Sequence, residues 1–272
     1  MSQDRVVQQH FQRMGQDGSY AAFYSEPSEL THDFFARRER VQEFLIPRLR
    51  SGQTVLDVGC GTGPMAEFFG SRGLRYHGLD TAQSMLDSLW QQHRDAPYAQ
   101  RIRLDVGSCE RLPYADESFD LLVAMGLLEY LDNMQPTLRE IARVVRPDCL
   151  AVLTVPNYVS LNRFLMRNGS FVTTTYRLGK RLAGAADEKR AEIVHRELAP
   201  RKLDGLMRGV GFEAVGRAFY DYKLVCYPLS RVFPRFAYAV NRRLENKAPS
   251  FLANGYIGFY QKQAARAKPQ SS

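Results

Sequence analysis

Residues 55–64, VLDVGCGTGP, place closely spaced glycines directly behind an apolar run. Gly59, Gly61 and Gly63 would let the backbone approach a bound ligand closely. The dinucleotide fingerprint has the spacing GxGxxG, and its third glycine would fall at Pro64. A P-loop would need a Lys-Ser or Lys-Thr pair after the glycines, and none follows. The loop therefore predicts a ligand other than a dinucleotide or a nucleoside triphosphate.

Two carboxylates accompany this loop. Asp57 stands at its mouth, where a negative charge would oppose a pyrophosphate and favour a ligand with positive charge. S-adenosylmethionine is such a ligand, because it carries a sulfonium and an α-ammonium group and no phosphate. Asp80 ends the next apolar run, where doubly wound folds place a carboxylate that accepts from the two ribose hydroxyls. The two acids together indicate S-adenosylmethionine as the cofactor.

Alternating strands and helices are expected to position these residues. The strands are predicted at 54–59, 75–80, 101–106, 119–126, 150–156, 212–220 and 254–263, and helices at 64–73, 84–95, 134–147 and 201–211. Near-continuous apolar strands separated by helices are typical of a parallel sheet that is covered on both faces. The predicted fold class is therefore α/β, with a doubly wound sheet.

Three segments fall outside the alternation and divide the chain. Insertions at the carboxyl end of such a sheet are well placed to build a substrate site. The predicted parts are an N-terminal helical lid (1–50), a cofactor-binding core (51–156), a substrate-cap insertion (157–200), the rest of the core (201–263, with an insertion at 221–253) and a tail (264–272).

The net charge of +8 is unevenly distributed, with −5 on residues 1–156 and +13 on residues 157–272. A basic half could face an anionic substrate, nucleic acid or a membrane, or it could be solvated surface. Its basic residues are interleaved with aromatic ones, which suits stacked bases, an anionic lipid or a planar substrate. Because Phe233 and Phe236 recur at helical spacing, we favour a helical cap whose aromatic side chains form its core.

Cysteine usage and the N-terminus bear on the compartment. The four cysteines are scattered, without a CxxC pair or the spacing of metal ligands. No apolar run reaches the ~18 residues needed to span a bilayer, and the N-terminus lacks the apolar stretch of a signal peptide. We therefore expect a reduced, cytoplasmic protein.

Four motifs follow one another along the chain: VLDVGCGTGP, GLDTAQSML, LPYADESFDLLVAMGLLEYL and LREIARVVRP. In this order and spacing the chain resembles the class I S-adenosylmethionine-dependent methyltransferases, strongly over about residues 40–160 and by architecture over 200–262. The resemblance implies a Rossmann-like, seven-stranded and mostly parallel sheet with an antiparallel last strand. It also implies helical insertions that roof the active site.

The resemblance implies a set of cofactor-binding residues: Asp57, Gly59, Cys60, Gly61, Gly63, Asp80, Thr81, Met85, Ser108, Cys109, Glu110, Met125 and Gly126. Asp57 and the glycine backbone would surround the methionine portion, and Asp80 would hold the ribose. Ser108 stands where family members commonly have Asp, and its hydroxyl can still accept from the adenine amino group. Adenine recognition would then depend more on the backbone of Cys109 and Glu110.

The stretch MGLLEYL (125–131) resembles the MExLEH of quinone-pathway O-methyltransferases, whose acids and histidine are associated with a divalent metal. Glu129 is retained here, while Gly126 and Tyr130 replace the outer acid and the histidine. A lone carboxylate is a poor metal site, so we predict that no metal binds.

Methyl transfer from a sulfonium is an in-line displacement in which the protein aligns nucleophile, methyl and sulfur and excludes water. A base is needed only where the nucleophile carries a proton at neutral pH. The catalytic candidates are His32 and Tyr24, and the substrate-lining candidates are Tyr20, Arg37, Tyr158 and His195. For each, a packing or solvated-surface role is the competing interpretation.

The expected function is methylation of an O or N atom of a small molecule, of acidic or aromatic character, in a biosynthetic or tailoring pathway. RNA methylation is a weaker alternative, because no RNA-binding module and no (D/N)PPY-type motif is present. Methylation of a lipid or quinone at a membrane surface stays open, with peripheral membrane contact. So does cyclisation of the cofactor's aminobutyryl chain.

Overall fold

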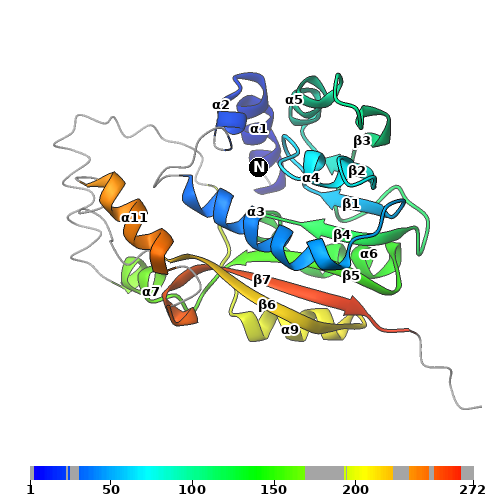
Figure 1. The fold of residues 1–272 in the computed structure, drawn as a ribbon. Coiled ribbons are helices and arrows are strands. Elements are labelled where there is room, and N and C mark those ends of the chain that lie inside the picture. The colour runs from blue at the N-terminus through cyan, green and yellow to red at the C-terminus, as the bar shows by residue number, and fades with distance from the viewer. Residues whose placement is uncertain are drawn as a thin grey trace, which may run out of the picture.

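The computed structural model describes residues 3–22, 24, 31–168, 193, 195–222, 233–244 and 248–264. Its centre is a seven-stranded sheet in the order β3-β2-β1-β4-β5-β7-β6 (Figure 1). The strands are β1 (Thr54–Val58), β2 (Arg75–Asp80), β3 (Ile102–Val106), β4 (Phe119–Ala124), β5 (Val145–Pro156), β6 (Phe212–Tyr222) and β7 (Ala253–Lys262). The helices that matter below are α1 (Gln3–Gln16), α2 (Ser19–Ala22), α3 (His32–Leu45), α4 (Ala66–Gly70), α5 (Gln83–His93), α6 (Met134–Val144), α7 (Leu161–Asn168), α9 (Pro200–Gly209) and α11 (Pro234–Leu244).

The sheet is mostly parallel. Strands β1 to β5 pair in parallel, whereas β7 runs antiparallel to both β5 and β6. The order reverses between β1 and β4, which is the switch point where doubly wound sheets bind ligands at the carboxyl ends of their strands. The predicted fold class and the antiparallel last strand are confirmed.

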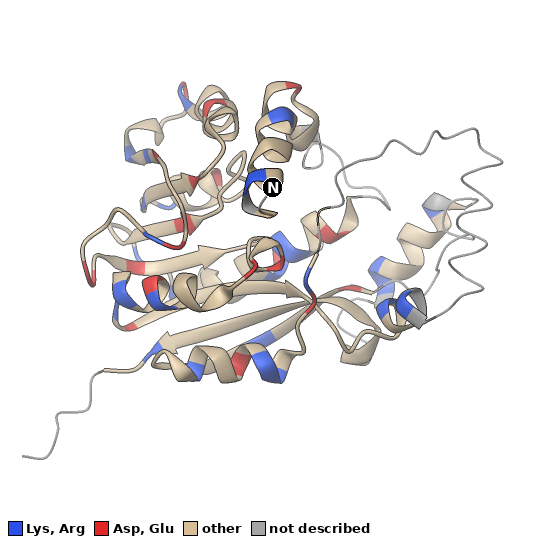
Figure 2. Ribbon diagram, turned by 180° about the vertical axis from the view of Figure 1, so that it is seen from behind, with Lys and Arg blue, Asp and Glu red and all other residues tan. Residues whose placement is uncertain are grey.

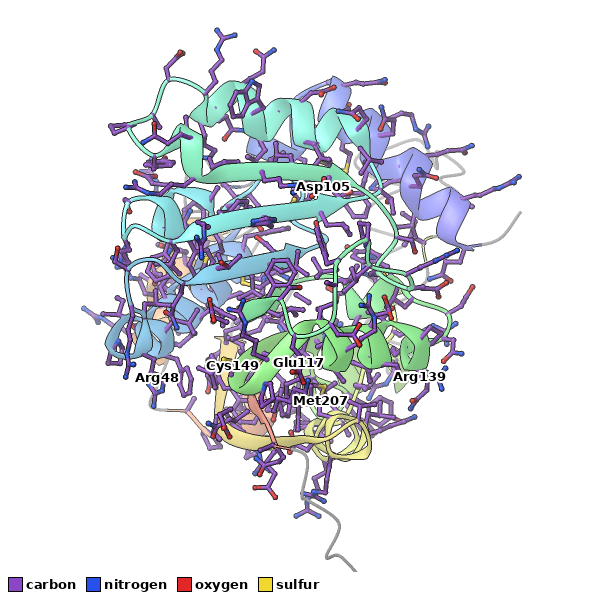
Figure 3. The ribbon with its side chains drawn as sticks, turned by 90° about the vertical axis from the view of Figure 1, so that its right-hand side faces the viewer. Arg48, Asp105, Glu117, Arg139, Cys149 and Met207 are labelled. Atoms are coloured by element: carbon purple, nitrogen blue, oxygen red, sulfur yellow. The ribbon has the colours of Figure 1, made fainter. Side chains whose placement is uncertain are left out.

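Helices cover both faces of the sheet, because neighbouring residues of its buried strands point to opposite sides. On one face α3, α4 and α5 contribute Leu45, Phe69 and Leu89 to a core. On the other face α6 and α9 contribute Leu138 and Met207, and Met207 is labelled on α9 in Figure 3. The two buried layers hold the central strands rigidly, so the loops at their carboxyl ends are positioned by the whole core.

The strand boundaries agree with the sequence prediction to within two residues, except at β5. We predicted that α6 would close at Arg146-Pro147 and that the strand would begin at residue 150. Instead α6 ends at Val144, and β5 begins at Val145, which pairs with Phe119. The register then shifts, with Asp148 at φ 61°, before regular pairing resumes. An irregularity at the start of β5 accommodates Pro147, which cannot donate to the ladder.

Helix α1 lies beside the N-terminal end of α5, as Figure 1 shows. The Ser84 hydroxyl donates to the carbonyl of Gln12 at 2.7 Å, and the Gln8 amide donates to the carbonyl of Thr81 at 3.0 Å. A β-carbon at Gly15 would lie 2.8 Å from the carbonyl carbon of Ser84, so only glycine allows this approach. These contacts place α1 over the carboxyl ends of the strands. The predicted helical character of residues 1–50 is confirmed for α1, α2 and α3.

Much of the predicted cap, at 169–192, 194, 223–232 and 245–247, lies outside the described residues, as does the tail from 265 onward. Helix α11 forms as the spacing predicts, but Phe233 and Phe236 are 58% and 63% exposed. The prediction that these two side chains form a core is wrong, because α11 turns Ala237 and Asn241 inward instead.

Basic and acidic residues are intermingled over the described elements (Figure 2), and α9 and α11 carry several of the basic ones. Among the helices that the structure describes, none combines the length and apolar character of a membrane span.

Candidate functional site

The glycine loop after β1 has the backbone conformation that its sequence requires. Gly59, Gly61 and Gly63 all have positive φ, of 70°, 54° and 71°. The amides of Gly59 and Cys60 donate to the carbonyl of Leu79 at 2.7 and 3.2 Å, which fastens the loop to the end of β2. A β-carbon at Gly63 would lie 2.4 Å from a methyl group of Leu89, so this glycine serves the packing of α5.

Asp80 ends β2 opposite the loop. Its Oδ2 accepts from the amide of Gly61, and its Oδ1 accepts from the amide of Ala82, both at 2.9 Å. Burial raises the pKa of the Asp80 carboxyl, while these backbone hydrogen bonds act in the opposite direction. Each carboxylate oxygen keeps further acceptor capacity, so Asp80 can still receive hydrogen bonds from two hydroxyl groups.

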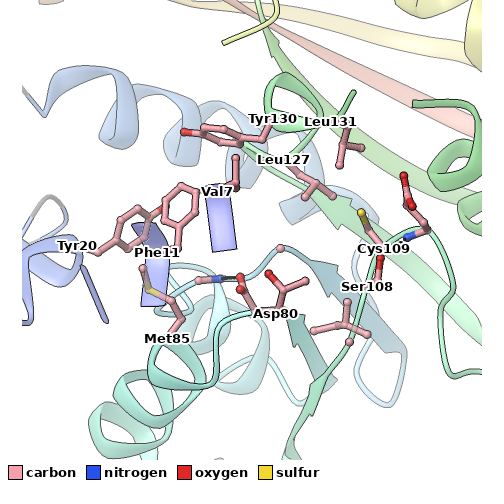
Figure 4. A pocket seen from close by; sticks show the side chains of 17 residues that line it. Val7, Phe11, Tyr20, Asp80, Met85, Ser108, Cys109, Leu127, Tyr130 and Leu131 are labelled. Carbon is pink, nitrogen blue, oxygen red and sulfur yellow. Dashed lines mark hydrogen bonds between the residues drawn. The ribbon is translucent and has the colours of Figure 1, made fainter. Parts of the chain in front are cut away.

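A cavity of about 150 Å³ opens between the loop, the ends of β2 and β4, and helix α1 (Figure 4). Nine of the predicted cofactor-binding residues line it: Gly59, Gly61, Asp80, Thr81, Met85, Ser108, Cys109, Glu110 and Gly126. Tyr20, predicted to line the substrate site, also lines this cavity. Further lining residues that were not predicted from the sequence are Val7, Phe11, Leu79, Gly107, Leu127, Tyr130 and Leu131. Val7 and Phe11 are spaced four residues apart on α1, and this spacing was the available signal.

The other four predicted residues, Asp57, Cys60, Gly63 and Met125, are not among the lining residues. Asp57 is buried, and its Oδ2 accepts from the Tyr76 hydroxyl at 2.8 Å. The pKa of Asp57 is raised to about 7, mainly because the carboxyl is buried. The hydrogen bond from Tyr76 lowers this pKa, and the nearby charge of Asp80 raises it further. Its expected contact with the methionine portion of a cofactor therefore stays a prediction.

The far end of this cavity is built around Ser108. The amide of Glu110 donates to the Ser108 hydroxyl oxygen at 3.2 Å, which closes a tight turn after β3. One lone pair of that oxygen stays free to accept, as recognition of an adenine amino group requires. Asp80 and Glu110 are the charged residues among those that line the cavity in the described part of the chain.

A second cavity, of about 240 Å³, adjoins the first. Its lining residues are Tyr20, Asp33, Phe34, Arg37, Gly126, Glu129, Tyr130, Pro156, Arg163, His195, Tyr220, Asp221 and Asn254. The two cavities share the walls formed by Tyr20, Gly126 and Tyr130. A group bound at this junction would therefore border on both.

The polar floor of the second cavity is held by buried hydrogen bonds at the ends of β5, β6 and β7. The Asn157 amide donates to the carbonyl of Ala253 at 2.9 Å, and the Ser160 hydroxyl donates to Asn254 Oδ1 at 2.8 Å. The other end of the Asn254 side chain donates to Asp221 Oδ2 at 3.1 Å. These bonds fix the carboxylate of Asp221 in the cavity wall.

Of the predicted substrate-lining residues, Tyr20, Arg37 and His195 line this second cavity. Tyr158 does not: it is 51% exposed, and the Arg167 guanidinium lies over its ring at 4.2 Å. His195 makes an edge contact with Tyr130, with ring centroids 5.0 Å apart. Burial and the charge of Arg163 lower the pKa of His195, which favours its neutral form.

Arg37 is buried in the wall of the second cavity. Its Nη2 donates to the Tyr24 hydroxyl at 3.3 Å, and its guanidinium lies 5.3 Å from the ring centroid of Phe34. Burial acts to lower the pKa of Arg37, but Tyr24, Tyr220 and Glu129 raise it above the ordinary range, so the group stays charged.

Glu129 is the second buried charged side chain of the junction. Burial raises its pKa, and the positive charge of Arg37 opposes the shift. Its Oε2 has no hydrogen-bond partner among the residues that the structure describes. Glu129 can therefore present either a proton or a lone pair to a bound molecule.

The two predicted catalytic residues lie behind the cavity walls. His32 begins α3 and makes an edge contact with Tyr238, with centroids 5.4 Å apart. Tyr24 contacts Phe34 at 5.2 Å and receives the hydrogen bond from Arg37. Neither residue is among those that line the two cavities. Their catalytic roles stay predictions.

Within the described residues, no three His, Cys, Asp or Glu side chains gather as a set of metal ligands. The place next to Gly126 holds the guanidinium of Arg37 instead. The expected absence of a metal stays a prediction.

A methyltransferase domain family matches residues 56–153. The chain is similar to methyltransferase GfsG of Streptomyces halstedii, with 32% identity over 48% of each chain. It is also similar to O-methyltransferase resE of Aspergillus sclerotiorum, with 30% identity over 53% of this chain and 58% of that one. Residues 56–153 thus form a methyltransferase domain of the class I, S-adenosylmethionine-dependent kind. The chain spans about half the length of the two curated relatives that it matches.

The fold of this chain is similar to a solved structure of magnesium protoporphyrin IX methyltransferase (ChlM) from Synechocystis PCC 6803 with bound S-adenosylhomocysteine. The TM-score is 0.66 at 12% identity, over 96% of this chain and all of that one. The cofactor of the family is S-adenosylmethionine. The first cavity fits it, because the glycine loop allows close approach and the charged lining residues, Asp80 and Glu110, suit a cationic ligand without phosphate.

Proposed function

We propose that this protein transfers the methyl group of S-adenosylmethionine to an O or N atom of a small molecule bound in the second cavity. The observation that carries the proposal is the junction formed by Tyr20, Gly126 and Tyr130, which line both cavities. In-line displacement needs the acceptor atom, the methyl carbon and the sulfur on one line, and adjoining cavities provide such a path.

The residues of the first cavity would each perform a separate binding task. Asp80 accepts from the ribose hydroxyls, and Ser108 accepts from the adenine amino group. Phe11 of α1 and Tyr130 meet edge to face over this cavity, with centroids 5.3 Å apart, and exclude water from its mouth. The bound cofactor supplies the activated methyl group, and these side chains orient it.

The size and lining of the second cavity favour a small acceptor. A volume of about 240 Å³ accommodates a compact molecule, and Arg37, Glu129 and Asp221 in its wall are all buried. The relative named as an O-methyltransferase adds support for an oxygen acceptor. We place the reaction in small-molecule biosynthesis or tailoring.

A transfer assay with radioactive methyl-labelled S-adenosylmethionine tests the proposal with three acceptor arms. The arms are a panel of small carboxylic acids, phenols and amines, total RNA, and vesicles of anionic phospholipid. We expect label in the small-molecule arm, and its loss in the Asp80→Asn variant. The proposal would be refuted if label appeared only in RNA or in the vesicles. It would also be refuted if the enzyme bound the cofactor but labelled no member of the small-molecule panel.

A further inference from the structure

Arg37 has hydrogen-bonding capacity that the described protein does not use. A guanidinium carries five N–H donors and a permanent charge. The side chain is only 7% exposed, and the structure describes one hydrogen bond from it, to Tyr24. None of its nitrogens is among the fully buried polar atoms without a partner. Because Arg37 lines the second cavity, its remaining donors open into that space.

The guanidinium lies directly at the junction of the two cavities. A β-carbon built on Gly126 would lie 2.7 Å from Nη1 of Arg37 and 3.4 Å from its Nη2. Gly126 lines both cavities, and its amide is held by the Thr154 hydroxyl at 2.9 Å. A group bound to Arg37 beside Gly126 is therefore next to the cofactor cavity.

Most of the other charged groups of the second cavity have partners of their own. Arg163 donates to Glu197 at 2.9 Å, and Asp221 accepts from Asn254 at 3.1 Å. Asp33 is likewise not without an interaction partner in the protein. Burial raises the pKa of Glu129, which favours its neutral form. Glu129 helps to raise the pKa of Arg37, but Arg37 forms no ion pair with a described carboxylate, so its charge can attract an anionic ligand.

The geometry points to a carboxylate of the acceptor as that ligand: we propose that it binds Arg37 at the junction and is itself the group that receives the methyl. The planar fork of a guanidinium matches the two oxygens of a carboxylate better than it matches a single oxygen. This inference rests on the proposed function and names its substrate class.

The reaction balances without a general base. A lone pair on one carboxylate oxygen forms the bond to the methyl carbon, and the bond between that carbon and the sulfonium sulfur breaks with its electron pair on sulfur. The products are a neutral methyl ester and neutral S-adenosylhomocysteine, and no proton is released. The positions of His32 and Tyr24 outside the cavity walls agree with this, and the ester loses its charge attraction to Arg37, which favours its release.

Binding to the complex with S-adenosylhomocysteine tests the inference by calorimetry. The probes are benzoate, 4-hydroxybenzoate and succinate, each with its primary amide. We expect at least one carboxylate to bind at least about tenfold more tightly than its amide, because charge-assisted hydrogen bonds exceed neutral ones. Arg37→Gln should weaken that binding about ten- to a hundredfold and leave S-adenosylhomocysteine affinity unchanged.

Arg38→Gln is the matched control, because Arg38 is the next residue of α3 and lies over Phe35 at 5.0 Å, away from both cavities. It should change neither affinity. Equal binding of amides and carboxylates, no binding of any carboxylate, or full carboxylate binding by Arg37→Gln would overturn the inference.

The methyl products separate this inference from the proposed function. Transfer to neutral acceptors that is unaffected by Arg37→Gln leaves the proposed function in place and removes the carboxylate. Carboxylate binding that depends on Arg37, without transfer to any acceptor, keeps the anion site and refutes the proposed function.

Discussion

The guanidinium of Arg37 lies against Gly126, so closely that a β-carbon at the glycine would come within 2.7 Å of Nη1. The contact joins α3 to the loop after β4, two elements that are far apart in the chain. It brings the positive charge to the wall that the two cavities share. The glycine at position 126 is thus the reason that an arginine can occupy the junction.

Gly126→Ala should destabilise the fold and displace Arg37. The φ of Gly126 is 70°, and a left-handed conformation costs a residue with a β-carbon roughly 1–2 kcal/mol. Gly52→Ala is the matched control, because Gly52 has φ 86° with nothing within 4 Å of a built β-carbon. Urea unfolding should show a larger loss of stability for Gly126→Ala. Equal losses of stability in the two variants would mean that Arg37 moves away from the added β-carbon at little cost in free energy.

Asp80→Asn should weaken S-adenosylmethionine binding about ten- to a hundredfold, because hydrogen bonds to a charged acceptor are replaced by weaker ones. Asp87→Asn offers a comparison on α5, since Asp87 is exposed and accepts from Gln83 at 2.7 Å. Calorimetry should show unchanged affinity for the comparison variant. Comparable affinities for Asp80→Asn and the wild type would show that Asp80 does not hold the ribose.

Asp57 should make stability depend on pH. Its pKa of about 7 in the folded protein is raised above the ordinary value of 3.8, mainly by burial. Between these values the native state binds a proton more tightly than the unfolded state does. The free energy of unfolding therefore falls as pH rises from about 4 to about 7.

Asp57→Asn should remove this fall, which amounts to a few kcal/mol at most, on the order expected for a buried carboxylate. The amide oxygen can still accept from Tyr76, so the fold is retained. Urea unfolding at pH 5 and pH 8 would measure the free energy of unfolding of both proteins. The wild type should lose stability relative to the variant at the higher pH. A difference that is the same at both pH values would contradict the assignment.

Gly15→Ala should weaken cofactor binding by separating α1 from α5. Its β-carbon would lie 2.8 Å from the Ser84 carbonyl carbon and 2.9 Å from the Met85 amide nitrogen, and both are backbone atoms. Gly205→Ala in α9 has nothing within 4 Å, so it should stabilise by about 0.5–1 kcal/mol and leave binding unchanged. Full affinity of Gly15→Ala for S-adenosylmethionine would show that α1 does not cover the site.

The sheet and the glycine loop could be predicted because their signals are local. Buried strands have apolar runs, and Gly59, Gly61 and Asp80 stand at strand ends that must meet at one edge of a parallel sheet. The start of β5 at Val145 could not be predicted, because Pro147 normally ends regular structure and the bulge depends on the partner strand.

The contacts between distant segments carried no local signal. Val7 and Phe11 line the cofactor cavity only because α1 lies beside α5. The side chain of Asp57 is engaged by Tyr76, which lies on the neighbouring strand. Phe233 and Phe236 have the spacing of a buried face, yet α11 exposes them. Spacing predicts which residues share a face, and tertiary packing decides whether that face is buried.

The most direct test of methyl transfer across the junction is mass spectrometry of a reaction with CD3-labelled S-adenosylmethionine and the small-molecule panel. Transfer predicts S-adenosylhomocysteine and an acceptor that carries the CD3 group, formed in equal amounts. Methylthioadenosine in place of S-adenosylhomocysteine, or bound cofactor that is recovered intact with every acceptor of the panel, would contradict it.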